Sequence, residues 1–312
     1  MKEGQGSRTA EYMALFRALE SSLPAERRLF HDPLARDFLG PSLAVVARLA
    51  RFPGFRDLVP RIIDYRWPGA RSSAVARTRF IDDAVGPALE EQIKQFVVLG
   101  AGFDSRAYRL RGLRKITVFE VDHPDTLRRK RSALGRALAV VPEHVRLVPT
   151  DFNQGDLEQA MAAAGYRESS STFFLWEGVT NYLTEAAVDA TLRWCARAAP
   201  GSQLLFTYVE RAVLENPQSF FGTKKLFATL EAAGEKWTWG IEPSVLPEFL
   251  AQRGLSLEQD VGAAEYRHLY WKERARTMRG YEFYRIAVAR VTAAGGTTPL
   301  DPGCPPAHDR VG

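Results

Sequence analysis

The stretch from Gln95 to Asp122, QFVVLGAGFDSRAYRLRGLRKITVFEVD, decides the fold of this 312-residue chain. It contains two apolar runs of buried-strand length, Phe96–Leu99 and Ile116–Val121. A Gly100-Ala101-Gly102 turn and roughly ten residues of helical character lie between them. A strand, a glycine loop, a helix and a second strand predict the opening of a doubly wound α/β domain, a fold that binds nucleotide-like ligands.

The charges beside the glycine loop narrow the kind of ligand. A dinucleotide-binding loop has a third glycine and keeps its helix N-terminus free of negative charge, because a pyrophosphate binds there. In this chain Ser105 stands where the third glycine belongs, and Asp104 precedes it. We interpret Asp104 as a cap of the following helix, and its charge also disfavours a phosphate.

Acidic residues mark the ends of three successive predicted strands. Glu120 and Asp122 end the second strand, Asp151 follows the third, and Glu177 ends the fourth. The carboxyl ends of parallel strands line the crevice in which such sheets bind their ligands. This arrangement predicts a cationic nucleoside with hydroxyl groups and without phosphate, and S-adenosyl-L-methionine has this chemistry.

The composition is that of an ordinary globular protein, with 46% apolar and 25% charged residues. The net charge of +5 is spread along the chain. Its densest basic cluster, Arg128–Arg131, is interpreted as the solvated face of a helix. We therefore expect no nucleic-acid partner, because nucleic-acid binding calls for a broader basic surface.

The cysteines and the apolar runs of the sequence indicate the cellular compartment of the protein. Only two cysteines occur, Cys195 and Cys304, which excludes a disulfide framework and favours a reducing environment. The first residues lack the apolar segment of a secretion signal, and the run Leu43–Ala50 is too short to span a bilayer and contains Arg48. The expected localisation is cytoplasmic, without a membrane partner.

Helical patterns dominate the residues before the first strand. Apolar residues recur every three or four positions in Arg8–Glu20, Ser42–Phe52, Phe55–Tyr65 and Ser72–Gln92. Asp32 is expected to cap a further helix whose first turn holds Pro33. Residues 1–92 are therefore predicted to form a helical cap on the strand-end face, with residues 1–7 as a disordered leader.

The α/β alternation continues after Asp122. Helices are predicted in Pro124–Leu138, Gly155–Ala164, Thr184–Ala199 and Val245–Arg253, and strands at Val145–Pro149, Thr172–Trp176, Gln203–Val209, Ser256–Val261 and Tyr281–Val291. Residues 93–291 are thus predicted to form a doubly wound, Rossmann-like, mostly parallel sheet of about seven strands. An aromatic-rich insertion at about 210–242 is expected to lie over the cleft like a lid, and residues 292–312 to be a disordered tail.

A series of motifs follows the same order along the chain: SRTAE at Ser7–Glu11, RALE at Arg17–Glu20, DPLA at Asp32–Ala35, VLGAGFDSR at Val98–Arg106, FEVDHP at Phe119–Pro124, DF at Asp151–Phe152 and WEGVTNYLT at Trp176–Thr184. Together they resemble the bacterial branch of the leucine carboxyl methyltransferase family, over about residues 8 to 290. The resemblance implies a class I S-adenosylmethionine-dependent methyltransferase with a helical N-terminal cap.

The same resemblance implies which residues bind the methionine part of the cofactor. Arg17 and Arg77 hold its carboxylate, and Glu177 lies near its amine. The Gly100-Ala101-Gly102 loop approaches the amino-acid part. The chemistry agrees, because guanidinium groups pair with carboxylates through two hydrogen bonds, and glycine lets the backbone come close.

For the nucleoside part, the resemblance implies that Asp122 grips the ribose and that Asp151 and Phe152 address the adenine. Glu120 either shares the ribose with Asp122 or only supports the loop. A carboxylate can accept hydrogen bonds from vicinal hydroxyls or from an exocyclic amine, which suits these roles.

No acid/base or metal constellation is visible in the sequence. The five histidines fit neither a catalytic triad nor the spacing of metal ligands: His31, His123, His144, His268 and His308. Methyl transfer is an in-line displacement that needs alignment and a dry site, and a carboxylate is already ionised at neutral pH. The first hypothesis is therefore O-methylation of a carboxylate on a small, natural-product-like molecule, which gives a methyl ester and S-adenosyl-L-homocysteine.

Two alternatives stay open. One is methylation of a hydroxyl or amine of a small molecule, for which Tyr208 and His268 are the candidates to orient the acceptor. The other is a non-catalytic protein that binds S-adenosylmethionine or a nucleotide.

Overall fold

The structure, a computed structural model, describes residues 8–152, 157–276 and 279–293. The predicted leader, residues 1–7, and the predicted tail from residue 294 onward lie outside these described residues.

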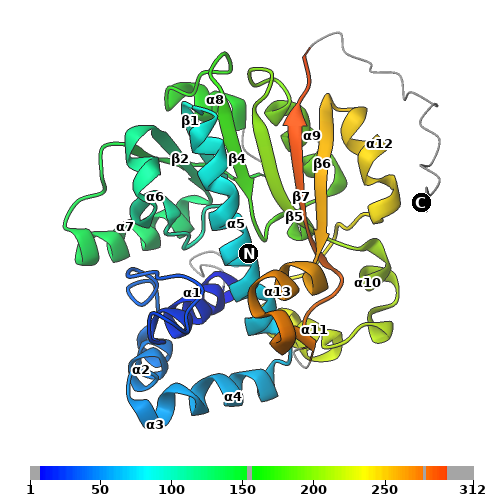
Figure 1. The fold of residues 1–312 in the computed structure, drawn as a ribbon. Helices are drawn as coiled ribbons and strands as arrows, with labels where there is room; N and C mark the ends of the chain where they lie inside the picture. The colour runs from blue at the N-terminus through cyan, green and yellow to red at the C-terminus, as the bar shows by residue number, and fades with distance from the viewer. Residues whose placement is uncertain (1–7, 153–156, 277–278, 294–312) are drawn as a thin grey trace, which may run out of the picture.

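A seven-stranded sheet forms the centre of the molecule, with the order β3-β2-β1-β4-β5-β7-β6 (Figure 1). Its strands are β1 Gln95–Leu99, β2 Thr117–Asp122, β3 Val145–Pro149, β4 Thr172–Trp176, β5 Gln203–Val209, β6 Leu255–Gly262 and β7 Tyr284–Val291. The first five strands pair in parallel, and β7 runs antiparallel between β5 and β6. The predicted doubly wound, mostly parallel sheet is confirmed.

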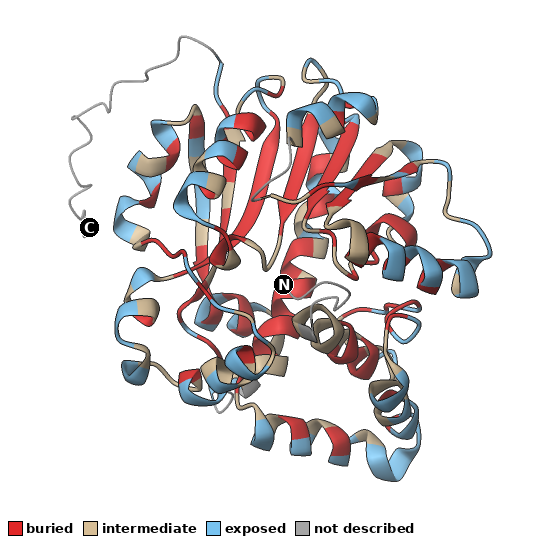
Figure 2. Ribbon diagram, turned by 180° about the vertical axis from the view of Figure 1, so that it is seen from behind, coloured by how far each residue is buried: buried red, intermediate tan, exposed pale blue. Residues whose placement is uncertain are grey.

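Alternating side chains of the strands build one apolar core on each face of the sheet. Phe96 and Val98 of β1 pack in the first core and Val97 and Leu99 in the second, as expected for strands buried on both sides. Figure 2 shows the strands as an almost continuous buried layer. The first core is covered by α5 (Ala70–Glu90), α7 (Pro124–Leu138) and α13 (Ala263–Trp271), and the second by α8 (Leu157–Ala163), α9 (Glu185–Cys195) and α12 (Leu246–Ala251).

The described residues before α5 form a cap at the carboxyl ends of the parallel strands (Figure 1). The cap has a core of its own, to which Leu15 and Phe16 contribute from α1 and Ile63 from α4. Helix α5 supplies residues to this core and to the sheet core, so it joins the two parts. The helices before α5 are α1 (Arg8–Ser21), α2 (Pro41–Leu49), α3 (Pro53–Arg56) and α4 (Leu58–Arg66).

The residues after β5 fold over the same edge of the sheet. They include α10 (Arg211–Glu215), the 3-10 turn η3 (Pro217–Ser219) and α11 (Thr223–Ala232). Trp237 fixes this insertion, because its ring packs edge-on against Phe227, Phe283 and Tyr284 in a separate aromatic cluster.

Four local expectations were wrong. The helix expected after the glycine loop is only the short α6 (Arg106–Arg109) followed by the 3-10 turn η1 (Arg111–Lys115). Turns replace the helix expected after Asp32, whose carboxylate accepts hydrogen bonds from the backbone N–H groups of residues 34 and 35. Helix α13 was not predicted. The last strand begins at Tyr284 instead of Tyr281, because a turn joins the two residues through the N–H of Tyr284 and the carbonyl of Tyr281.

The remaining 3-10 turns are η2 (Thr180–Tyr182), η4 (Pro243–Val245) and η5 (Lys272–Arg276). Turn η2 follows β4 directly and brings Tyr182 to the strand-end face, where the cavity described below opens.

Candidate functional site

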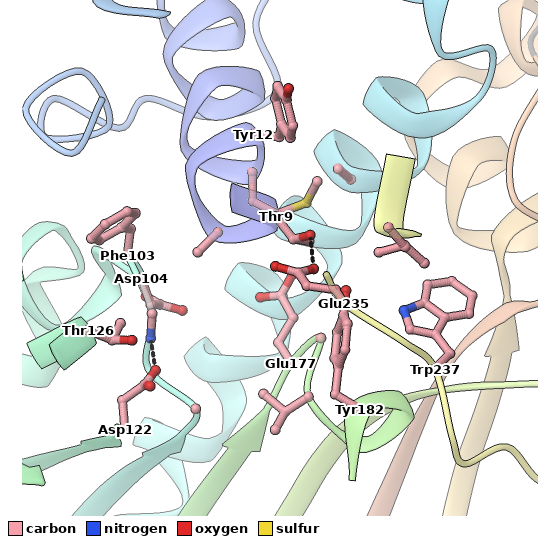
Figure 3. A pocket seen from close by; sticks show the side chains of 18 of the residues that line it. Thr9, Tyr12, Phe103, Asp104, Asp122, Thr126, Glu177, Tyr182, Glu235 and Trp237 are labelled. Carbon is pink, nitrogen blue, oxygen red and sulfur yellow. Dashed lines mark hydrogen bonds between the residues drawn. The ribbon is translucent and has the colours of Figure 1, made fainter. Parts of the chain in front are cut away.

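A cavity of about 740 Å³ lies between the strand ends, the cap and the insertion. Its floor comes from the loops after β1, β2, β3 and β4, and its walls come from α1, α5 and the segment that contains Trp237 (Figure 3). A cavity at the carboxyl ends of parallel strands is where the sequence placed the ligand.

The glycine loop has a backbone conformation that requires glycine. Gly100 has a φ of +71°, and a Cβ there would come within 2.2 Å of the side chain of Val179. Gly102 has a φ of +41°, which also favours glycine. The N–H groups of Gly100 and Ala101 donate to the carbonyl of Val121, at 2.8 and 2.9 Å. The loop is thus fixed against the end of β2, and no other residue fits at Gly100 without strain.

Asp122 fastens the same loop from the end of β2. Its carboxylate accepts hydrogen bonds from the N–H groups of Gly102 and His123, each at 2.6 Å (Figure 3). Burial raises the pKa of this carboxyl above its usual value, and the backbone donors oppose that effect. Asp122 lines the cavity beside Thr126.

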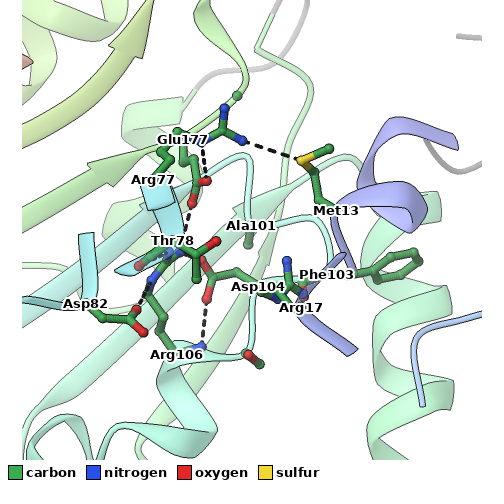
Figure 4. Close-up of polar contacts among 12 residues, drawn as sticks. Met13, Arg17, Arg77, Thr78, Asp82, Ala101, Phe103, Asp104, Arg106 and Glu177 are labelled. Carbon is green, nitrogen blue, oxygen red and sulfur yellow. Dashed lines mark hydrogen bonds and ion pairs between the residues drawn. The ribbon is translucent and has the colours of Figure 1, made fainter. Parts of the chain in front are cut away.

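A network of buried charges lies behind the loop (Figure 4). The guanidinium of Arg106 contacts three carboxylates, those of Asp82 at 2.8 Å, Glu177 at 2.9 Å and Asp104. Glu177 also accepts a hydrogen bond from Nε of Arg77 at 2.8 Å. The network therefore holds Glu177 and Arg77 together at the edge of the cavity, which both residues line.

The arginines keep these carboxylates ionised. Burial alone would raise the pKa of Asp104, but Arg106 and other cations outweigh it and hold that pKa at about 2. Burial likewise opposes ionisation of Glu177, and Arg106 and Arg77 bring its pKa below the ordinary value. The expected capping role of Asp104 is also present, because its carboxylate accepts the N–H of Arg106 at 2.7 Å.

Arg17 reaches the cavity from α1. Its guanidinium pairs with Asp32 at 2.9 Å and donates to the carbonyl of Phe103. Asp32 in turn accepts a hydrogen bond from the hydroxyl of Ser105 at 2.6 Å. Asp32 thus ties the cap to the glycine loop, in addition to capping its own turn.

The structure brings nine of the predicted site residues together on the cavity wall: Arg17, Arg77, Gly100, Ala101, Gly102, Asp122, Asp151, Phe152 and Glu177. Three others do not line it. Glu120 is fully buried beneath the loop, where it pairs with Lys130 at 2.9 Å and accepts from the hydroxyl of Tyr108 at 2.7 Å. This geometry supports the loop-supporting role for Glu120 rather than a shared contact with the ribose. Lys130 belongs to the basic run that was interpreted as solvated, and for this residue that interpretation was wrong.

The two residues suggested to orient an acceptor also lie elsewhere. The hydroxyl of Tyr208 is bonded to Asp260 at 2.9 Å and to Arg285 at 3.1 Å, and its ring is buried in the sheet core. His268 is exposed on α13 and is not among the residues that line the cavity. Neither residue lines the cavity, so the structure lends no support to the acceptor-orienting roles suggested for them.

Sequence reasoning missed several residues of the outer wall. Thr9 of α1 donates a hydrogen bond to Glu235 of the insertion at 2.6 Å, across the cavity (Figure 3). Tyr182 and Trp237 line the same end. Two residues could have been found from the sequence, because Tyr182 lies inside the motif WEGVTNYLT and Arg106 ends the motif VLGAGFDSR. Trp237 belongs to the aromatic-rich insertion that was expected over the cleft, whereas nothing in the sequence pointed to Glu235, because the insertion shows no regular spacing.

Comparisons with known proteins agree with this geometry. The family model described as leucine carboxyl methyltransferase matches residues 10–196. A protein of Frankia alni is 37% identical over 66% of this chain and 70% of its own length, and one of Streptomyces coelicolor is 36% identical over the same shares. Both relatives are named as S-adenosyl-L-methionine-dependent methyltransferases.

Two solved structures share the fold. A crystal structure from Thermobifida fusca, titled as a methyltransferase, has a TM-score of 0.54 at 19% identity and covers 94% of this chain and 97% of its own. A DUF574 family protein from Streptomyces avermitilis has a TM-score of 0.53 at 14% identity and covers 88% and 96%. The predicted fold, enzyme class and methyl donor are confirmed, and the chain belongs to the leucine carboxyl methyltransferase family of S-adenosylmethionine-dependent methyltransferases.

Proposed function

We propose that the protein methylates a carboxylate oxygen of a small molecule, and that the cavity holds S-adenosylmethionine and this acceptor side by side. The observation that carries the proposal is the set of hydrogen-bond donors at the outer end of the cavity. These donors suit an anionic oxygen, while the acidic groups of the inner end suit a cationic nucleoside.

The inner end fits the nucleoside and methionine parts of the donor. The backbone of Gly100 lies on the cavity wall without a side chain, because Val179 occupies the position of a Cβ, and Asp122 offers a carboxylate beside it. Asp151 and Phe152 lie on the same wall and suit an adenine, one by its polar group and the other by its ring. S-adenosylmethionine supplies an electrophilic methyl group on a sulfonium when it is bound here.

The methionine end fits a carboxylate and an amine. One terminal nitrogen of Arg77 contacts the sulfur of Met13 at 3.5 Å, and a thioether is a weak acceptor. An incoming carboxylate can therefore take this donor without breaking the ion pair of Arg77 with Glu177. The Arg77 guanidinium also lies 4.7 Å from the ring centre of Tyr284, which holds it in place. We assign the methionine carboxylate to Arg77 with Arg17, and the amine to Glu177.

The acceptor end presents phenols that stay protonated at neutral pH. Burial raises the pKa of Tyr182 and Tyr281, and both line the cavity. A protonated phenol donates a hydrogen bond to a carboxylate and cannot remove a proton from a hydroxyl or amine. Since a carboxylate needs no base, these groups orient it and the surrounding rings exclude water.

The test is the chemical stability of the transferred methyl group. The purified protein is incubated with methyl-labelled S-adenosylmethionine and small-molecule extracts of its host, and the labelled product is treated with mild base. A methyl ester releases volatile labelled methanol, and this is the expected result. Label that stays with the product after base treatment contradicts carboxylate methylation.

One observation favours a second candidate function, methylation of a hydroxyl or amine. The carboxylate of Glu235 lies on the wall of the acceptor end and is held by Thr9. A carboxylate at this position can serve as a general base. The variant Glu235→Gln separates the two cases: it slows a reaction that needs the base by at least about a hundredfold, and it leaves the kcat of carboxylate methylation largely unchanged.

A further inference from the structure

A row of exposed apolar side chains runs along the outer side of the cap. Among the described residues, eleven large apolar side chains are exposed, and seven of them lie between positions 45 and 65: Val45, Leu49, Phe52, Phe55, Leu58, Ile62 and Tyr65. Val45 and Leu49 of α2 are four residues apart, and Leu58, Ile62 and Tyr65 of α4 are three or four apart, so within each helix these side chains lie on one face. We call these seven residues the cap stripe.

The cap stripe is more apolar than the outer face of an ordinary surface helix. The opposite faces of α2 and α4 are already buried in the cap core, through Ala47, Val59 and Ile63. A helix that is apolar on both faces is normally covered on both. In the cap stripe Tyr65 is 83% exposed, and Phe52 and Ile62 are each 56% exposed. A continuous exposed patch of this kind marks an interaction surface.

The charge around the cap stripe indicates what covers it. Residues 41–66 contain five arginines and two aspartates. Both aspartates are paired with arginines from outside this segment, Asp57 with Arg27 at 2.9 Å and Asp64 with Arg71 at 2.6 Å. The exposed arginines that flank the stripe are Arg48, Arg51, Arg61 and Arg66. The surface is therefore apolar and cationic, and it complements a surface that is apolar and anionic.

A second copy of the chain does not meet this requirement. A two-fold contact brings the same patch of both copies together, which places arginines against arginines. The two aspartates of the segment are already engaged by Arg27 and Arg71 and cannot offset that repulsion.

The position of the cap stripe favours a lipid surface over a protein partner. None of its seven residues lines the cavity, and helices α2, α3 and α4 form the outer edge of the molecule (Figures 1 and 2). The exposed rings of Phe52 and Phe55 lie at the start of the short helix α3, on either side of Pro53 and Gly54. Protruding rings suit the boundary between lipid head groups and acyl chains, whereas anchor residues of protein interfaces fill pockets.

We infer that the cap stripe docks the protein on a membrane surface that contains anionic lipids. The apolar side chains enter the head-group boundary, and the flanking guanidinium groups lie at the level of the lipid phosphates. The contact is peripheral, because no helix among the described residues is long and apolar enough to cross a bilayer. This inference departs from the expectation of no membrane partner, which considered spanning segments alone.

The test is sedimentation of the full-length protein with vesicles. One set contains phosphatidylglycerol and phosphatidylcholine in equal parts, and the other contains phosphatidylcholine alone. We expect binding to the anionic vesicles that weakens as salt is added. The variant Phe52→Ser/Phe55→Ser lowers the partition constant at least about tenfold, and Arg48→Glu/Arg51→Glu lowers it by about fivefold for each charge removed.

Matched controls carry the same changes elsewhere on the surface. Val140→Ser/Leu269→Ser removes two apolar side chains that are exposed outside the cap, and Arg128→Glu reverses an exposed charge of α7. These controls keep full binding, and circular dichroism confirms that every variant is folded. Equal sedimentation with both vesicle sets, or binding that the stripe variants leave unchanged, overturns the inference. Two further outcomes also overturn it. One is a dimer of the protein that the variant Phe52→Ser/Phe55→Ser dissociates, and the other is binding to polyaspartate beads without binding to anionic vesicles.

Discussion

The buried guanidinium of Arg106 offers the sharpest test of how the site is held. Its side chain is 3% exposed and contacts three carboxylates, those of Asp82, Asp104 and Glu177. The variant Arg106→Gln keeps much of the volume and removes the charge. We expect the free energy of unfolding to fall by about 3 to 5 kcal/mol at pH 7, because removal of the buried cation leaves the buried carboxylates without a compensating charge.

The pH dependence of this loss follows from the pKa of Asp104. That pKa is lowered from 3.8 to about 2 in the folded protein, so the carboxylate contributes about 2 kcal/mol of stability. This stabilisation is fully present at pH values above the pKa of Asp104 in the unfolded chain. It is lost as the pH falls through the pKa of Asp104 in the folded protein. About 1 kcal/mol of it is gone at pH 3. The Arg106→Gln protein lacks most of this contribution, so its deficit relative to the unchanged protein narrows on acidification.

Urea unfolding followed by tryptophan fluorescence measures both effects at pH 7 and pH 3. Arg193→Gln is the control, because its partner Asp189 lies at the surface and the pair is worth less than about 0.5 kcal/mol. A deficit for Arg106→Gln below about 1 kcal/mol at pH 7, or an equal deficit at both pH values, would refute the buried-network explanation.

Three further predictions concern the cavity. Gly100→Ala weakens S-adenosylmethionine binding in calorimetry and lowers the free energy of unfolding by more than the roughly 1 to 2 kcal/mol that a side chain costs at a positive φ, because its Cβ meets Val179. Gly201→Ala is the control: Gly201 has a φ of +84° with no atom near its Cβ position, so only the cost of the positive φ is expected there. Asp122→Asn weakens that binding by about 1 to 3 kcal/mol at neutral pH. Since burial raises the pKa of Asp122, the unchanged protein loses affinity as the pH falls through a value above 3.8, and Asp122→Asn does not show this loss. His268→Ala leaves the KM for the acceptor unchanged, and a severalfold rise would return His268 to the site.

The sheet was predictable because its strands are locally encoded. The first six strands agree with the predicted ranges to within one residue, and β1 to β5 are short, largely apolar runs bounded by polar or turn residues. Helix α13 was missed for the opposite reason. It is held by the contact of Tyr266 with Phe80, far away in sequence, and by the ion pair of Arg267 with Glu282, and its own apolar spacing is weak. The late start of β7 likewise reflects packing of Phe283 into the insertion cluster.

For the inner part of the site, the sequence predicted which acidic residues stand at the ends of the parallel strands. Asp122 and Glu177 follow from the rule that parallel strands present their carboxyl ends to the ligand. Glu120 satisfies the same rule, yet it lies two residues earlier on β2 and is covered by Lys130 of α7. The sequence does not distinguish these two acids, because the distinction depends on how far the loop and α7 reach over the strand. The role of Arg106 as a common partner also needs three segments to meet, from α5, the loop and β4.

The outer wall depends almost wholly on contacts between distant parts of the chain. Thr9 and Glu235 are 226 positions apart, and their hydrogen bond brings the cap and the insertion together over the acceptor end. Trp237 is placed by rings of the insertion and of the last strand. No local pattern encodes such a meeting, so the acceptor is not predictable from spacing. We assign the methyl donor to the inner wall, and the outer wall is assembled by these long-range contacts. We therefore expect substitutions at Trp237 and Glu235 to change acceptor choice while leaving S-adenosylmethionine affinity intact.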